Sequence, residues 1–168
     1  RFMGACIYLG DGSMWTALRV SSAMSFPSHC PFHLALPVDD LDAARAFYVD
    51  LLGCELGRED PGRWVDINLG GHQLSLHHQT QETVAVTAHR VDGDAVPVRH
   101  FGLVLPMPAW CLLADRLRRA DVAFIIEPKV RFEGQTGEQA TMFFRDPAGN
   151  ALEFKSFLDP ERLFASSH

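Results

Sequence analysis

The chain has 168 residues, of which 47% are hydrophobic and 21% are charged, so it suits one compact domain or two small fused modules with an ordinary core. Its formal net charge of -6, without any basic stripe, argues against a nucleic-acid partner, because phosphate binding needs clustered Lys and Arg. The four cysteines lie far apart and form no CxxC pair, which is typical of a reducing compartment, so we expect a cytoplasmic protein.

The N-terminal stretch differs from the rest of the chain. It mixes Gly, Asp and Ser with short apolar runs and is too broken for a signal-peptide core or a membrane span. We therefore expect residues 1–23 to be an extension without a role in the chemistry, and no membrane partner. A single domain over residues 24–158 and a short tail over residues 159–168 would follow.

The first half of the domain predicts a strand, a helix and three more strands. Phe32–Val38 alternates large apolar residues with smaller or polar ones, as half-buried strands do. Asp39 and Asp40 offer N-cap oxygens to a helix whose apolar residues recur with a period near 3.6, and Gly53 is a natural end. The three strands predicted next are Cys54–Arg58, Arg63–Leu69 and His72–His78.

The second half repeats this order. His100–Leu105 predicts a strand, and Pro106 and Pro108 precede a helix with Trp110, Leu113, Leu117 and Ala120 on one face. The strands predicted after it are Val122–Ile126, with an extension towards Phe132, then Ala140–Arg145 and Ala151–Phe157. Residues 79–98 connect the halves and hold an Asp92-Gly93-Asp94 turn signal.

The pattern therefore predicts an α+β fold of two βαβββ modules, over residues 31–78 and 99–158. Each module would form a curved mixed sheet with its helix on the outer face, leaving the other face to line a funnel. Because successive strand residues point to opposite faces, His33, His100 and Glu153 are expected on the funnel side. Two imidazoles and one carboxylate are the ligands of an open, facially capped metal site.

Three motifs resemble the vicinal oxygen chelate superfamily, which comprises glyoxalases, bleomycin-resistance proteins and extradiol dioxygenases. They are FHLALPVDDLDAARAFYVDLLG, the restart RHFGLVLP, and FFRDPAGNALEF with its DPxGN turn. GHQLSLH and EPKVRFEG are similar to a subgroup of predicted extradiol-type dioxygenases. The resemblance implies metal ligands from the first strand of each module and the last strand of the second, which are His33, His100 and Glu153 here.

The resemblance also implies roles for neighbouring residues. The fourth ligand of glyoxalase-like members would fall at about Ser75, a poor ligand, which favours three ligands. His72, or His77 further along the strand, would transfer protons. Phe143 occupies the position of a tyrosine in dioxygenase relatives, which argues against a catechol as the substrate. Asn68 and Arg131 are further candidates for the substrate pocket.

These expectations combine into a metal-dependent, dioxygenase-like oxidoreductase that acts on a small oxygen-chelating molecule, with O2 as a co-substrate. Fe(II) is the first expectation for the metal and Mn(II) the second. A glyoxalase-like lyase or isomerase with Zn(II) or Ni(II) is an alternative, and so is a non-catalytic resistance protein that binds a small molecule. Open module edges in this fold commonly pair, so a homodimer is expected.

Overall fold

The computed structural model describes residues 30–79, 88–91, 93–135 and 137–164. From Pro31 onward they belong to one compact unit. The extension expected at residues 1–23 lies outside the described residues, as does part of the connector between the modules. Within the described part of the chain, no helix is long and apolar enough to cross a membrane.

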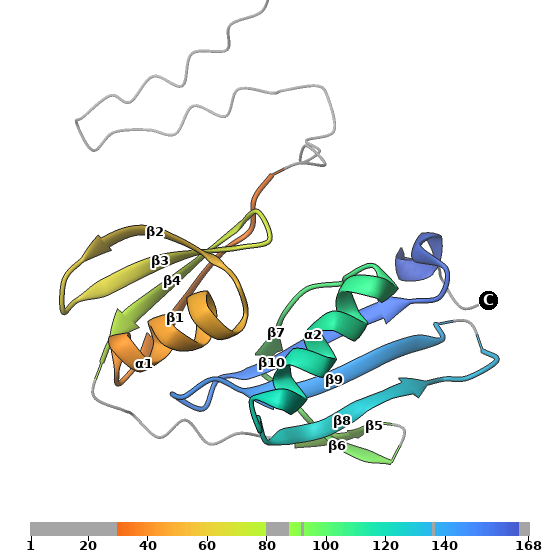
Figure 1. Cartoon of the computed structure of the whole chain (residues 1–168). Helices are drawn as coiled ribbons and strands as arrows, with labels where there is room; N and C mark the ends of the chain where they lie inside the picture. The colour runs from red at the N-terminus through yellow and green to blue at the C-terminus, as the bar shows by residue number, and fades with distance from the viewer. Residues whose placement is uncertain (1–29, 80–87, 92, 136, 165–168) are drawn as a thin grey trace, which may run out of the picture. The chain divides into compact units, whose positions relative to one another are not determined.

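Module 1, which we define as residues 31–78, forms a four-stranded sheet in the order β1-β4-β3-β2 (Figure 1). β1 runs parallel to β4, and the other neighbours are antiparallel. Asp40 caps the helix by accepting hydrogen bonds from two backbone amides, and Gly53, at φ +80°, follows its end. The elements are β1 His33–Val38, α1 Leu41–Arg45, the π-helix η1 Ala46–Leu51, β2 Glu55–Asp60, β3 Trp64–Leu69 and β4 His72–His78.

Module 2, residues 99–158, repeats this topology with the order β7-β10-β9-β8. Its first strand again lies parallel to its last, so the repeat predicted from the sequence is confirmed. The elements are β7 His100–Phe101, α2 Met107–Arg119, β8 Phe124–Arg131, β9 Gln139–Arg145 and β10 Ala151–Phe157, followed by a 3-10 helix, η2 Pro160–Phe164. The α+β fold class is confirmed, with the strands of the two modules in two separate four-stranded sheets.

The predicted strand His100–Leu105 is shorter than expected. β7 ends at Phe101, and Gly102 approaches β10 so closely that an added Cβ would lie 1.8 Å from the Glu153 carbonyl oxygen. Hydrogen bonds to β10 resume beyond this point, since the Leu105 amide donates to the Lys155 carbonyl at 2.7 Å. The glycine therefore lets the chain pass directly beside the strand that carries Glu153.

The connector contains a hairpin that the sequence signalled only by its turn. β5, Ala88–Val91, and β6, Asp94–Pro97, form a separate two-stranded sheet, and Gly93 takes φ +82° in the turn. Val96 of this hairpin packs against Ile126 and Phe143 of module 2. Figure 1 shows the hairpin beside β8. It covers part of the sheet face that lies opposite the helix.

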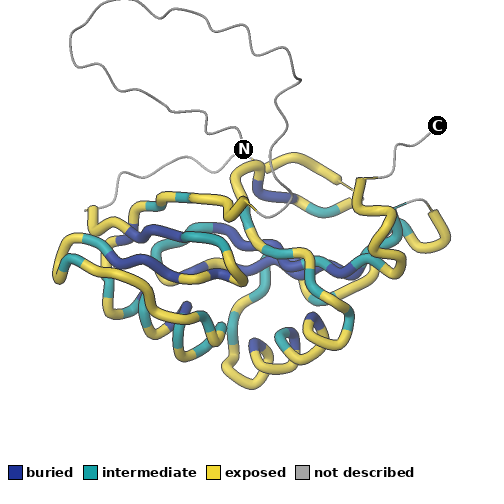
Figure 2. The backbone as a smooth tube through the Cα atoms, turned by 90° about the horizontal axis from the view of Figure 1, so that it is seen from above, coloured by how far each residue is buried: buried dark blue, intermediate teal, exposed yellow. Residues whose placement is uncertain are grey.

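One apolar core joins the two modules. It takes residues from α1, η1, β3 and β4 of module 1 and from α2, β9 and β10 of module 2. The buried segments of the helices lie on the side of the strands in Figure 2, and their buried residues belong to this core. Ala114 rather than the predicted Ala120 completes the buried stripe of α2, because Ala120 already lies at the exposed C-cap. The core also brings Phe47 of module 1 within 6.2 Å of Phe144 of module 2, measured between ring centres.

Candidate functional site

His100 and Glu153 form a pair on the face of module 2 that lies opposite α2. Glu153 is 5% exposed, and its Oε2 lies 3.2 Å from His100 Nε2. His100 Nδ1 lies 2.6 Å from the Pro97 carbonyl oxygen, an acceptor, so this nitrogen carries the proton. The ring of Phe143 meets the imidazole edge to face at 5.1 Å. The carbonyl thus fixes the ring with Nε2 towards the carboxylate, a support that metal-ligating histidines commonly have.

Two further groups donate to the Glu153 carboxylate. Thr141 Oγ1 donates to Oε1 at 2.7 Å, and Lys155 Nζ lies 3.0 Å from Oε2. Burial alone would raise the pKa of Glu153, but the hydrogen bonds from His100 and Thr141 and the charge of Lys155 outweigh it, so the pKa is lowered. The hydrogen bond with Glu153 raises the pKa of His100 in turn. The site therefore holds an ionised carboxylate in a largely buried place.

His33 lies in the other module. It is the first residue of β1, is exposed, and pairs with Gln73 of β4. In the part of the chain that the structure describes, no three His, Cys, Asp or Glu side chains are placed to hold a metal ion. Of the three predicted ligands, the structure thus brings His100 and Glu153 together. His33 as a ligand stays a prediction.

The register of the strands places Ser75 at the position in module 1 that Glu153 has in module 2. Ser75 lies two residues beyond the partner of His33, and Glu153 lies two residues beyond the partner of His100. Ser75 is buried and donates to Asp66 Oδ1 at 2.5 Å. Asp66 was not among the predicted site residues, although a single acid between Val65 and Ile67 in a predicted strand indicates a special environment.

Asp66 is a second buried carboxylate, on the sheet face of module 1 that lies opposite the helix. Besides Ser75, Gln73 Nε2 donates to it at 2.9 Å and Arg58 Nη2 at 3.4 Å. Burial would raise the pKa of Asp66, but these hydrogen bonds and the Arg58 charge lower it overall. Asp66 in module 1 and Glu153 in module 2 are thus each buried among three donors, and the pKa of each is lowered.

The two histidines predicted for proton transfer point to opposite faces of β4. His77 shares a face with Ser75, because side chains two residues apart on a strand point the same way. His72 shares the helix-side face with Leu74, and its Nδ1 accepts a hydrogen bond from the Phe32 amide at 2.9 Å. His77 is exposed and His72 half-buried. The catalytic role of either one stays a prediction.

The predicted pocket residues occupy three different places. Phe143 lies against His100, as described above. Arg131 is buried beneath the β5–β6 hairpin, where Nη2 donates to the Val91 carbonyl at 2.5 Å. Asn68 lines a cavity of about 460 Å³ between the modules, whose walls include neither His100 nor Glu153. These three residues therefore do not line one common pocket in this structure.

Paired βαβββ modules with a histidine–carboxylate pair on the neighbouring strands β7 and β10 define the class of the protein. A family model described as the Glyoxalase/Bleomycin resistance protein/Dioxygenase superfamily matches residues 31–154, and the chain belongs to this family. Members of the superfamily generally bind a divalent metal and small-molecule substrates, and they often form dimers.

Three relatives illustrate the breadth of the family. A glyoxalase/bleomycin resistance protein/dioxygenase from Alicyclobacillus acidocaldarius is 31% identical, with a TM-score of 0.67 over 80% of this chain and 96% of that chain. Lactoylglutathione lyase from Agrobacterium tumefaciens is 25% identical, with a TM-score of 0.57 over 83% and 98%. Virulence protein STM3117 of Salmonella typhimurium is 27% identical over 75% of this chain and 83% of its own length. The predicted extradiol subgroup is not established by these similarities.

Proposed function

We propose that the protein is a divalent-metal-dependent oxidoreductase of the dioxygenase type, acting on a small molecule with two adjacent oxygens. The observation that carries this proposal is the His100–Glu153 pair, whose imidazole is oriented by the Pro97 carbonyl and whose carboxylate is ionised and buried. His100, Glu153 and His33 are the proposed ligands, with Fe(II) as the first choice of metal and Mn(II) as the second. The bound metal would act as a Lewis acid that lowers the pKa of a substrate hydroxyl.

The pair fits two ligand positions of such a centre. Two neighbouring ligand atoms, each at about 2.1 Å from a metal, lie about 3 Å apart, and His100 Nε2 and Glu153 Oε2 are separated by 3.2 Å. Lys155 Nζ contacts the same Oε2 at 3.0 Å, so the ammonium would have to move away for a metal to bind there. The Lys155 side chain is 32% exposed and flexible, so this movement is open to it.

We further propose that His33 reaches the pair from a second copy of the chain. This would reconcile a three-ligand centre with the separation of His33 from the pair in a single chain, and dimers are frequent in the superfamily. His77, on the same face of β4 as Ser75, would then be better placed than His72 to move a proton. Phe143 would supply an apolar wall beside His100.

One observation favours a glyoxalase-like lyase as the second candidate. Asp66 brings a carboxylate within 2.5 Å of the Ser75 hydroxyl, close to the position of the missing fourth ligand. The similarity to a lactoylglutathione lyase is consistent with this alternative. A four-ligand centre of this type would use Zn(II) or Ni(II) and would act on a thiohemiacetal without consuming O2.

Cobalt(II) binding, followed by its absorption spectrum, tests the ligand set. His33→Asn, His100→Asn and Glu153→Gln should each weaken binding by about a hundredfold or more, whereas His89→Asn, on the exposed strand β5, should not. An equal mixture of the His33→Asn and Glu153→Gln chains, unfolded and refolded together, should regain about a quarter of the wild-type sites if two copies share each centre. Recovery of no sites would contradict the shared centre.

Turnover separates the proposed activities. Substrate-dependent O2 uptake by the anaerobically purified, Fe(II)-loaded protein would support the dioxygenase, tested on a panel of catechols and other vicinal oxygen compounds. Activity of the Zn(II)- or Ni(II)-loaded protein on the thiohemiacetal of methylglyoxal and glutathione, lost in Asp66→Asn, would favour the lyase. Tight ligand binding without metal binding would favour the resistance-protein alternative instead.

A further inference from the structure

Among the described residues, the contacts that hold the β5–β6 hairpin on module 2 all involve side chains, apart from the chain that continues from Pro97 to β7. Its two strands pair only with each other among the described strands, and an isolated two-stranded hairpin is marginally stable in water. Its position over the module therefore depends on the contacts of Val96 with the apolar surface and on the polar groups around its turn. These contacts, together with the short link to β7, set the position of Pro97, the last residue of β6.

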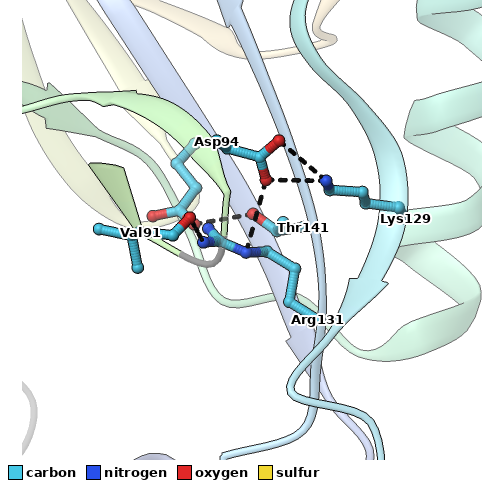
Figure 3. A network of polar contacts seen from close by, with 6 residues as sticks. Val91, Asp94, Lys129, Arg131 and Thr141 are labelled. Atoms are coloured by element: carbon cyan, nitrogen blue, oxygen red, sulfur yellow. Dashed lines mark hydrogen bonds and ion pairs between the residues drawn. The ribbon is translucent and has the colours of Figure 1, made fainter. Parts of the chain in front are cut away.

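The polar contacts form a clamp on both sides of the hairpin turn, as Figure 3 shows. Lys129 and Arg131, both from β8, point towards Asp94, with Lys129 Nζ at 2.7 Å and Arg131 Nε at 3.8 Å from Oδ2. Arg131 also donates from Nη2 to the carbonyl of Val91, the last residue of β5. One guanidinium thus holds the end of β5 and the start of β6.

Burial makes the removal of one partner of this clamp costly. The Arg131 side chain is 3% exposed and the Asp94 side chain 22%, whereas Lys129 is 42% exposed. An exposed ion pair contributes little, but removal of one partner from a buried pair leaves a charge without its counterion. Asp94 and Arg131 therefore carry most of the clamp, and Lys129 adds less.

We propose that Asp94 and Arg131 are positioning residues for His100. By fixing the hairpin they hold the Pro97 carbonyl 2.6 Å from His100 Nδ1, and this hydrogen bond directs Nε2 towards Glu153. His100 has a 28% exposed side chain and can rotate when that carbonyl moves. The inference rests on the proposed function, in which His100 is a metal ligand, and it gives Arg131 a role other than contact with the substrate.

The Arg131 guanidinium also lies beside Thr141, which supports the Glu153 carboxylate. Figure 3 places the Thr141 side chain beside Arg131, and Thr141 Oγ1 donates to Glu153 Oε1. The clamp thus lies next to the hydrogen bond that supports Glu153, and at the other end of β6 from the carbonyl that supports His100. A connector outside both sheets would in this way set the geometry of a centre inside module 2.

Nuclear magnetic resonance of the metal-free protein, labelled with 15N-histidine, tests the proposal directly. The wild type should show one imidazole Nδ1–H signal protected from solvent exchange, assigned to His100 by its absence in His100→Asn. Asp94→Asn should abolish this protection. Asp60→Asn, which removes the exposed ion pair of Asp60 with Arg63, is the matched control and should retain it.

Cobalt(II) affinity is the second readout. Asp94→Asn should bind cobalt(II) about 10- to 100-fold more weakly, the usual effect of losing an outer support of a metal ligand, and Lys129→Gln should have a smaller effect. Arg131→Lys, which keeps the charge but cannot reach both Asp94 and Val91, should reproduce the Asp94→Asn result if that variant melts too early for study. Both readouts are compared at temperatures at which circular dichroism shows the variant folded.

The outcomes separate this proposal from the proposed function. A protected Nδ1–H signal in both Asp94→Asn and Arg131→Lys would overturn the positioning role, whatever the cobalt(II) affinity. Loss of the signal in these variants, with cobalt(II) binding unchanged in them and in His100→Asn, would uphold the positioning role and refute His100 as a metal ligand.

Discussion

The two modules share a topology but differ on the sheet face that lies opposite the helix. In module 1 this face is largely open, and His33, Pro37 and His77 are exposed on it. In module 2 the equivalent face is more buried, with Thr141, Phe143 and Glu153 all buried on it, and the β5–β6 hairpin packs on part of it. The two modules thus have the same topology, and the hairpin of the connector covers part of this sheet face in module 2.

The two modules share one topology, but they bury their carboxylates on different strands and among different donors. Glu153 comes from the last strand of module 2, whereas Asp66 comes from the third strand of module 1 and bonds to Ser75, which occupies the position of Glu153. Glu153 receives an imidazole and an ammonium, but Asp66 receives an amide and a mostly exposed guanidinium. Only the first arrangement combines a carboxylate with a nitrogen that is suited to a metal.

Truncation of the shared core should have the largest effect on stability. Phe144 is fully buried, stacks on Phe154 with ring centres 5.8 Å apart, and also contacts Phe47 of module 1. Phe144→Ala should therefore lower the free energy of unfolding by about 3–5 kcal/mol, and Leu76→Ala in module 1 by about 2–5 kcal/mol. Because the core joins the modules, both variants should shift one common transition.

Tryptophan fluorescence can follow each module separately. Trp64 lies in module 1 and Trp110 in module 2, so variants that keep one of them, with Trp15 also replaced, report on the modules one at a time. Coincident urea transitions are expected for the two reporters in the wild type and in both core variants. Separate transitions would show that the modules are independent and that their comparison as halves of one core is wrong.

The hydrogen bond between Tyr48 and Asp146 should contribute less. Tyr48, fully buried on η1, donates to Asp146 Oδ2 at 3.0 Å, and Asp146 also accepts from Asn150 in the turn before β10. Tyr48→Phe should cost about 1–2 kcal/mol in urea unfolding, because a buried acceptor loses one donor. A double-mutant cycle with Asp146→Asn should show coupling between the two positions. Additive effects would mean that this link between the modules carries no energy of its own.

The repetition of the sequence was sufficient to predict the modules and the face of the candidate site. β4 and β10 have the predicted bounds, and parity correctly placed His100 and Glu153 on the face opposite the helix. The same parity puts His72 on the side of Leu74, which could have been read from the sequence. The β5–β6 hairpin could not be predicted from the sequence, because its strands have only four residues each and are positioned by side chains far along the chain.

The inter-module cavity at Asn68 was also beyond prediction from the sequence. It depends on how the β3–β4 turn of one module meets Leu103 and α2 of the other, which local patterns do not encode. The pairing of Asp66 with Ser75 likewise required the register that the Gly70-Gly71 turn imposes on β3 and β4. Contacts between elements, rather than the elements themselves, were therefore what the sequence left undetermined.

The smallest expected effect is a difference in acid sensitivity among three buried carboxylates. The pKa of Glu153 and that of Asp66 are lowered in the folded protein, so the stability they contribute is present above their unfolded pKa and is lost as the pH falls through the folded pKa. Burial raises the pKa of Asp146, although hydrogen bonds from Asn150 oppose this, so its contribution is complete at low pH and is lost as the pH rises.

Urea midpoints measured from about pH 7 down to about pH 2 should therefore change in opposite directions, relative to the wild type, in the three variants. Glu153→Gln and Asp66→Asn should both lose less stability on acidification than the wild type, because each removes a carboxylate that resists protonation in the folded state. Asp146→Asn should lose more, because it lacks a group whose protonation favours folding. An Asp66→Asn profile equal to that of the wild type would mean that module 1, unlike module 2, gains nothing from its buried charge.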